Sequence, residues 1–263
     1  MGRRQIAGTG WKMNMTAVET TLYAAALESR LAGLDTSALD LFVLPPFTSL
    51  HAAAAGFAAS RVAFGGQNMH WDETGAWTGE ISAAMLIEAG CRYVELAHSE
   101  RLAHFGETYE LVQRKVDAAL RHGLTPILCL GETAEDKRSG KADLVLSQQL
   151  ATALAQQAAA RVPRVVLAYE PRWAIGTAAA APPEYVAARH AALRAELDAR
   201  FGAAVAEATR IVYGGSVTPQ NGTELIALPN VDGLFVGRAA WTPAGFFEII
   251  KIVNDAARTK ETP

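Results

Sequence analysis

The chain of 263 residues has little cysteine, no marked excess of charge of either sign and no long uninterrupted apolar run. Its two cysteines, Cys91 and Cys129, lie inside apolar stretches, with no second cysteine or histidine at metal-ligand spacing. A disulfide framework and a zinc site are therefore not expected, and a reducing cytoplasm is the expected location. We predict neither a metal nor a cofactor.

The charge balance also excludes classes of partner. The chain has 24 Lys and Arg against 27 Asp and Glu, a net charge of −3, which creates no field that would attract nucleic acid or a membrane surface. The N-terminus lacks the apolar core of a signal peptide, and no run approaches the length of a membrane span. We expect a soluble protein in which any bound anion is held by local contacts.

Short apolar runs alternate with stretches of helical periodicity along the whole chain. The predicted strands lie near residues 4–11, 39–45, 61–67, 91–97, 124–131, 164–170, 209–215 and 231–237. The predicted helices cover 20–31, 83–88, 109–122, 142–161, 183–201, 218–228 and 246–257, with a shorter one near 50–59.

This order predicts an α/β fold, a single (βα)8 TIM barrel formed by residues 1–263 as one domain. Strands that are apolar throughout are typical of parallel sheets covered on both faces. A doubly wound open sheet is the alternative. Its phosphate-binding fingerprint GxGxxG is missing, because GTGWKM has methionine where the third glycine belongs.

Polar residues follow five of the eight predicted strands: Lys12, the run His98-Ser99-Glu100, Glu170, Ser216 and Gly237. Taken one at a time, each has an ordinary explanation, such as a solvated loop lysine, a turn glutamate or a helix N-cap at Ser99. The carboxyl ends of barrel strands meet at one mouth, where active sites are built. Their joint occurrence therefore predicts an active site.

Eight motifs carry a resemblance to a known family: GTGWKMN, GGQNMHWDETGAWTGE, ELAHSER, FGET, CLGE, AYEPRWAIGT, YGGSV and DGLFVG. In this order, from residue 8 to residue 238, they resemble the triosephosphate isomerases. The resemblance implies proton removal from a carbon beside a carbonyl, through an enediolate. Glu170 would be the base, His98 the electrophile and Lys12 the cation that stabilises negative charge, with Glu100, Ser99 and Cys129 in support.

The same resemblance implies how substrate is held and covered. Phosphate and substrate contacts would come from Gly10, Gly176, Gly214, Gly215, Ser216, Gly237 and Arg238. A lid is expected from Pro171 to about Ala181, including Trp173, Ala174, Ile175 and Thr177. The third loop, with Gln67, Asn68, Trp71, Trp77 and Thr78, would dock on a second copy, so a homodimer is expected.

The chain departs from the family pattern in four motifs. Gly10 replaces the usual asparagine, Arg238 replaces a glycine, the lid tip reads Ala178-Ala179-Ala180, and Leu102 ends the histidine motif. Lys12, His98 and Glu170 are retained while residues around the substrate pocket differ, which indicates a changed substrate. The features GTxWKMN, QNMHW, GAWTGE and GRxAW resemble the L-erythrulose-1-phosphate isomerase branch of the family. A triosephosphate isomerase proper is the alternative; a non-catalytic sugar-phosphate sensor would have no need of a base.

Overall fold

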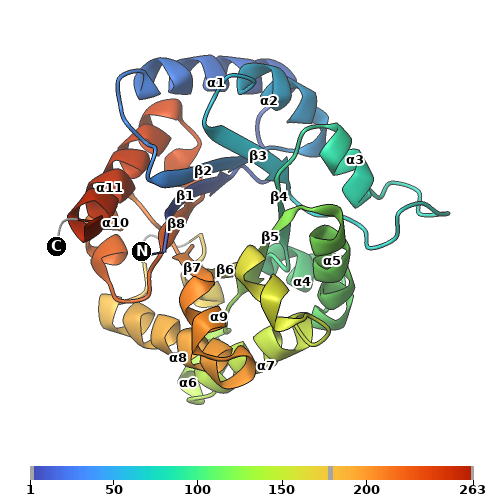
Figure 1. Cartoon of the computed structure of the whole chain (residues 1–263), viewed down its shortest axis with the longest axis vertical. Coiled ribbons are helices and arrows are strands. Elements are labelled where there is room, and N and C mark those ends of the chain that lie inside the picture. The colour runs from blue at the N-terminus through green and yellow to red at the C-terminus, as the bar shows by residue number, and fades with distance from the viewer. Residues whose placement is uncertain (1–2, 177–179, 262–263) are drawn as a thin grey trace.

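Eight parallel strands form a closed barrel at the centre of the molecule (Figure 1). The computed structural model describes residues 3–176 and 180–261. The strands pair in chain order, and β1 closes the ring against β8. Their bounds are β1 Gln5–Gly10, β2 Leu39–Leu44, β3 Val62–Gly66, β4 Tyr93–Leu96, β5 Thr125–Leu130, β6 Val166–Tyr169, β7 Arg210–Tyr213 and β8 Gly233–Val236. The predicted (βα)8 TIM barrel is confirmed.

The helices surround this ring (Figure 1). They are α1 Ala17–Leu31, α2 Leu50–Gly56, α3 Ala83–Glu88, α4 Ser99–His104, α5 Tyr109–His122, α6 Ala134–Arg138, α7 Ala142–Ala153, α8 Pro183–Phe201, α9 Ala203–Ala208, α10 Pro219–Ala227 and α11 Pro243–Glu261. In the part of the chain that is described, none of these helices has both the length and the apolar character needed to cross a bilayer.

One predicted helix is too long. The sequence predicts a helix over 142–161, but α7 stops at Ala153, and a separate 3-10 helix runs from Ala159 to Arg164. Pro163 lies inside that second segment and has no N–H to donate, so it cannot continue a regular helix. The short helices α6 and α9 were not predicted, because five or six residues show little periodicity.

Two layers of apolar side chains follow from the alternation of the strands. One layer fills the barrel and consists of Ile6, Phe42, Leu44, Tyr93, Ile127, Cys129, Val166, Ala168, Val212 and Phe235. The other lies between strands and helices. Successive strand residues point to opposite faces, so a residue two positions after an inward side chain also points inward. By this rule Glu95 follows Tyr93, and Glu170 follows Ala168, at the mouth of the barrel.

Candidate active site

A cavity of about 370 Å³ lies at the carboxyl ends of the strands. Residues from loops far apart in the sequence line it: Gly10, Lys12, Glu95, His98, Glu170, Ile175, Gly176, Gly214, Ser216, Val217, Thr218, Phe235, Val236, Gly237, Arg238, Ala239 and Trp241. Its size suits a small sugar phosphate. Barrel closure thus brings Lys12, His98 and Glu170 to one site.

Lys12 lies two residues after the end of β1, and hydrogen bonds hold both its backbone and its side chain. Its backbone has a φ of 52°, in the left-handed region that few non-glycine residues adopt. The side-chain amide of Gln67 donates to the Lys12 carbonyl at 2.9 Å. The ammonium group donates to Glu100 Oε1 at 2.5 Å, so Glu100 supports the site by pairing with Lys12. Burial alone would raise the pKa of Glu100, but this bond lowers it, so the carboxylate stays ionised.

His98 is held as a neutral imidazole at the start of α4. Its Nδ1 accepts a hydrogen bond from the backbone N–H of Glu100 at 3.2 Å, which requires an unprotonated Nδ1. Burial, together with the charge of Lys12, lowers the pKa of His98 to about 4. Nε2 then carries the proton and faces the cavity, 3.8 Å from Glu170 Oε2. A neutral N–H at this place can donate to an oxygen that gains negative charge.

Glu170 directly follows β6 and offers a base. Its side chain is buried, and Oε2 has no hydrogen-bond partner among the described residues. Burial raises the pKa of Glu170 well above its usual range. A carboxylate that has lost its water and has no donor to satisfy it is a stronger base toward carbon.

Gly214, directly after β7, leaves the space that the side chain of Glu170 occupies. A Cβ at residue 214 would lie 2.7 Å from Glu170 Cγ and 2.8 Å from Oε1. We predict that Gly214→Ala pushes the carboxylate out of place and lowers kcat/KM about 100-fold. Gly222→Ala is the control, since a Cβ there meets Ile252 at 3.4 Å and Leu234 at 3.6 Å, both ordinary contact distances, and residue 222 does not line the cavity. Equal activity of the two variants would show that the position of Glu170 does not depend on Gly214.

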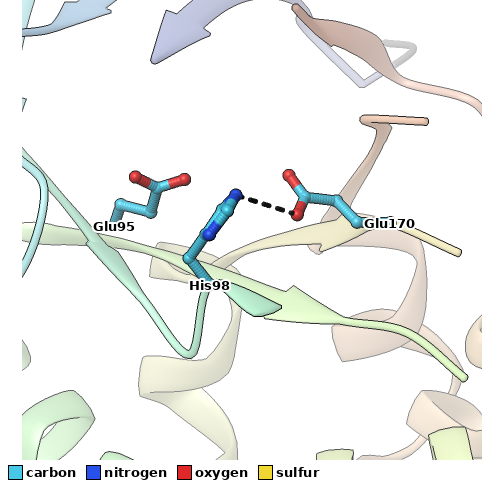
Figure 2. Close-up of side chains that lie close together, drawn as sticks. All are labelled: Glu95, His98 and Glu170. Carbon is cyan, nitrogen blue, oxygen red and sulfur yellow. Dashed lines mark ion pairs between the residues drawn. The ribbon is translucent and has the colours of Figure 1, made fainter. Parts of the chain in front are cut away.

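Glu95 is a lining residue that the sequence analysis missed. Figure 2 shows its carboxyl group on the opposite side of the His98 ring from Glu170. Its Oε1 lies 3.9 Å from the Cys129 sulfur, and burial raises the pKa of Glu95 to about 8. An acidic residue at an inward position of an otherwise apolar strand was the available signal. The aromatic walls Phe235 and Trp241 were missed as well.

The three groups of Figure 2 are also the described residues that could hold a metal ion. Ligand atoms of Glu95, His98 and Glu170 lie within 4.8 Å of one another. The positive charge of Lys12 acts on all three groups. It lowers the pKa of His98 further and opposes the rise that burial causes in the pKa values of Glu95 and Glu170. A second cation at the same place would be repelled, so the donor set suits proton transfer better than metal binding.

Comparison with known proteins agrees with this geometry. A family model described as triosephosphate isomerase matches residues 5–253. The chain belongs to the triosephosphate isomerase family. It is therefore an isomerase with the family's barrel.

Individual relatives bear two different names. An L-erythrulose-1-phosphate isomerase of Brucella abortus biovar 1 (strain 9-941) is 46% identical over 245 residues, covering 92% of this chain and 94% of the relative. One of the same name from Rhizobium meliloti (strain 1021) is 45% identical, covering 95% and 96%. A triosephosphate isomerase of Symbiobacterium thermophilum is 45% identical, covering 97% and 98%. Sequence identity to these relatives therefore hardly distinguishes an L-erythrulose-1-phosphate isomerase from a triosephosphate isomerase.

Most of the residues expected to bind phosphate line the same cavity. Gly176, Gly214, Ser216, Gly237 and Arg238 all line it. Gly215 does not line it, because its missing side chain would point at the ring of Tyr213, 2.5 Å from the hydroxyl oxygen. The Ser216 hydroxyl donates to the Ala174 carbonyl at 2.5 Å, which connects this loop to the expected lid.

The expected lid is anchored at its first residues. The Trp173 indole donates to Glu132 Oε1 at 2.7 Å, and the Lys137 ammonium lies 3.4 Å from the Trp173 ring centre. Pro171 is buried beside Glu170, Ala174 is buried, and Ile175 faces the cavity. Thr177 and the tip residues Ala178 and Ala179 lie outside the described residues.

The loop between β3 and α3 projects from the ring of helices (Figure 1). Trp77 is 48% exposed and Thr78 is exposed, whereas Trp71 is half-buried against His70, with ring centres 4.0 Å apart. Two residues grouped with this loop point elsewhere. Gln67 supports Lys12, and Asn68 is buried and accepts from Lys115 at 2.8 Å. The tip of the loop, not its first residues, is therefore the part open to a partner.

Proposed function

We propose that this isomerase interconverts L-erythrulose 1-phosphate and D-erythrulose 4-phosphate. The observation that carries the proposal is the open space at Gly10 beside Glu170, His98 and Lys12. A Cβ at residue 10 would lie 3.4 Å from the Phe235 ring, so a longer side chain would fill this part of the cavity. The four-carbon substrate is a triose phosphate with one added hydroxymethyl group, which needs such space. The names of several relatives support the same substrate.

The reaction is a proton shift between two neighbouring carbons. Glu170 removes the proton from C3 of L-erythrulose 1-phosphate, and the electron pair of that C–H bond moves to the C2 carbonyl oxygen, giving an enediolate. His98 Nε2–H donates to this oxygen and moves a proton between the two enediolate oxygens. Glu170 then returns a proton to C2. Triosephosphate isomerase is itself the reference case for a glutamate base with a neutral histidine.

Lys12 and the backbone of the cavity hold the negative charges. The Lys12 ammonium stabilises the enediolate and the phosphate in a site of low dielectric constant, where a fixed charge acts strongly. We assign phosphate binding to backbone N–H groups near Gly176, Ser216 and Gly237, as is common after strands seven and eight of such barrels. Arg238, exposed at the cavity edge, adds a second cation.

Steady-state kinetics with both substrates test the proposal. We expect kcat/KM for L-erythrulose 1-phosphate to exceed that for glyceraldehyde 3-phosphate by about 10-fold or more. A kcat/KM for glyceraldehyde 3-phosphate above roughly 10⁷ M⁻¹s⁻¹, near the diffusional limit, with little turnover of the four-carbon sugar, would identify a triosephosphate isomerase instead.

A side chain that fills the space at Gly10 should change the preference of the enzyme between the four-carbon sugar phosphate and the triose phosphate. We predict that Gly10→Asn lowers the ratio of kcat/KM for the four-carbon sugar to that for the triose by at least about 10-fold, because the side chain occupies the place of the added carbon. Residue 10 lies in β1 without a positive φ, so asparagine introduces no backbone strain. An unchanged ratio would place the four-carbon preference at another part of the cavity.

We further propose a cytoplasmic homodimer. Its support is the exposed Trp77 at the tip of the third loop and the nearly fully exposed Met13, beside Lys12, since large apolar side chains on a surface favour a partner. Two chains of 28.0 kDa should give twice that mass by light scattering. A mass of one chain would contradict the dimer. Two buried cysteines without a disulfide suit a reducing compartment.

A further inference from the structure

Glu95 is a buried acid whose carboxyl group reaches the cavity from the floor of the barrel. It lies on β4, at 7% exposure, between the apolar residues Val94 and Leu96. The neighbouring inward residues of the barrel are apolar, and the hydrogen bond recorded for its carboxyl group comes from a weak donor, the Cys129 thiol. Burying an acid without strong partners costs stability, so its presence calls for a partner that enters the cavity.

The space beside this acid is the space that Gly10 leaves open. A Cβ at residue 10 would lie 3.8 Å from Glu95 Oε2 and 3.4 Å from the Phe235 ring. Trp241 closes the same corner, and its indole donates to the Gly10 carbonyl at 3.2 Å. Gly10, Glu95, Phe235 and Trp241 all line the cavity. Together they form a corner with apolar walls and one carboxyl group.

This corner adjoins the reacting groups. Carboxylate and imidazole atoms of Glu95, His98 and Glu170 lie within 4.8 Å of one another, and Figure 2 shows His98 between the two acids. When Glu170 removes a proton from a substrate carbon and His98 binds the neighbouring oxygen, the remaining substituent on that carbon lies within reach of Glu95. A triose phosphate has only hydrogen at that position, whereas the four-carbon ketose phosphate has a hydroxymethyl group.

We propose that Glu95 is a specificity-determining residue whose carboxyl group hydrogen-bonds the terminal hydroxyl of the four-carbon sugar phosphate. The inference rests on the proposed function and names the residue that recognises the added group. The hydroxymethyl carbon packs on Phe235 and Trp241, and its hydroxyl meets the carboxyl group. Burial raises the pKa of Glu95 to about 8, so near neutral pH the group is mostly protonated and can both donate and accept. A site built to bind a hydroxyl discriminates strongly against substrates that lack it.

The test compares Glu95→Leu and Glu95→Gln with the wild type on three substrates: L-erythrulose 1-phosphate, dihydroxyacetone phosphate, and 3-hydroxy-2-oxobutyl phosphate, which has methyl in place of hydroxymethyl. Leucine removes the hydrogen-bonding group and keeps the volume, so kcat/KM for L-erythrulose 1-phosphate should fall about 100-fold. Turnover of the triose and of the methyl analogue should change less than about 3-fold. Glutamine, which still donates and accepts, should restore most of the loss.

The triose serves as an internal control for folding, because a misfolded variant loses all three activities. If Glu95→Leu melts at the wild-type temperature, a loss shared equally by the three substrates would overturn the role of Glu95, and so would no loss for L-erythrulose 1-phosphate. Failure of the proposed function looks different, since the wild type itself would then fail to turn over L-erythrulose 1-phosphate. A wild type that prefers the hydroxymethyl over the methyl substrate, with this preference abolished in Glu95→Leu, would establish the contact.

Discussion

Glu170→Gln is expected to lower kcat about 10³-fold while making the protein more resistant to heat. The amide has nearly the shape of the carboxylate but cannot accept the proton from carbon. It also carries no charge, so the cost of burying the unpartnered Oε2 atom as part of an anion disappears. Loss of activity with a gain in stability is the pattern expected of a residue strained by its function.

The stability gain should depend on pH in a defined direction. The pKa of Glu170 is raised in the folded protein, so the protonated group contributes stability that is complete below the unfolded pKa, near 4.5. That contribution is lost as the pH rises toward the folded pKa, whereas glutamine does not titrate. The melting temperature of Glu170→Gln should therefore exceed that of the wild type more at pH 8 than at pH 5. Glu224→Gln, an exposed position on α10, is the matched control and should change neither activity nor stability. A Glu170→Gln variant that keeps wild-type kcat would rule out Glu170 as the base.

Lys12→Met is the second change with a large expected effect, a decrease in kcat/KM of about 10³-fold. It removes the cation nearest the enediolate and leaves Glu100 without its partner. Because Lys12 lowers the pKa of both Glu170 and His98, its removal should raise both values. The acid limb of the pH profile of kcat/KM reports the base of the free enzyme, so this limb should move to higher pH.

Two control variants separate charge from position. Lys12→Arg keeps a positive charge at a changed place, so its rate should fall while the acid limb stays near that of the wild type. Lys141→Met removes an exposed lysine far along the chain, before α7, and should leave rate and profile unchanged. An acid limb that does not move in Lys12→Met would show that Lys12 does not act electrostatically on Glu170.

The sequence predicts the barrel well, because each of its eight strands is a short apolar run and each unit repeats the same order. The positions of Lys12, His98 and Glu170 after strands follow from the same pattern, since parallel strands of a barrel end at one mouth. Helix ends were less predictable. The residues just after Ala153 are leucine, alanine and glutamine, which favour a helix, yet the helix ends there, ten residues before Pro163.

The role of Glu95 could not be predicted from the local sequence pattern. Its neighbours define a strand, but only barrel closure places it near Gly10, which lies on β1 at a distance of 85 positions in the chain. The absence of the asparagine was visible in the sequence as a loss of one side chain. That a carboxyl group and two aromatic walls face the vacated space is a property of the assembled strands.

The most direct test of proton transfer on a four-carbon sugar is isomerisation in D₂O followed by NMR. With L-erythrulose 1-phosphate as the starting material, the product should be D-erythrulose 4-phosphate with deuterium at C3. This carbon is C2 of the starting sugar, the one to which Glu170 returns a proton. Product that forms at full rate with protium alone at C3 would contradict a proton on Glu170 that exchanges with solvent, and no product at all would contradict the proposed substrate.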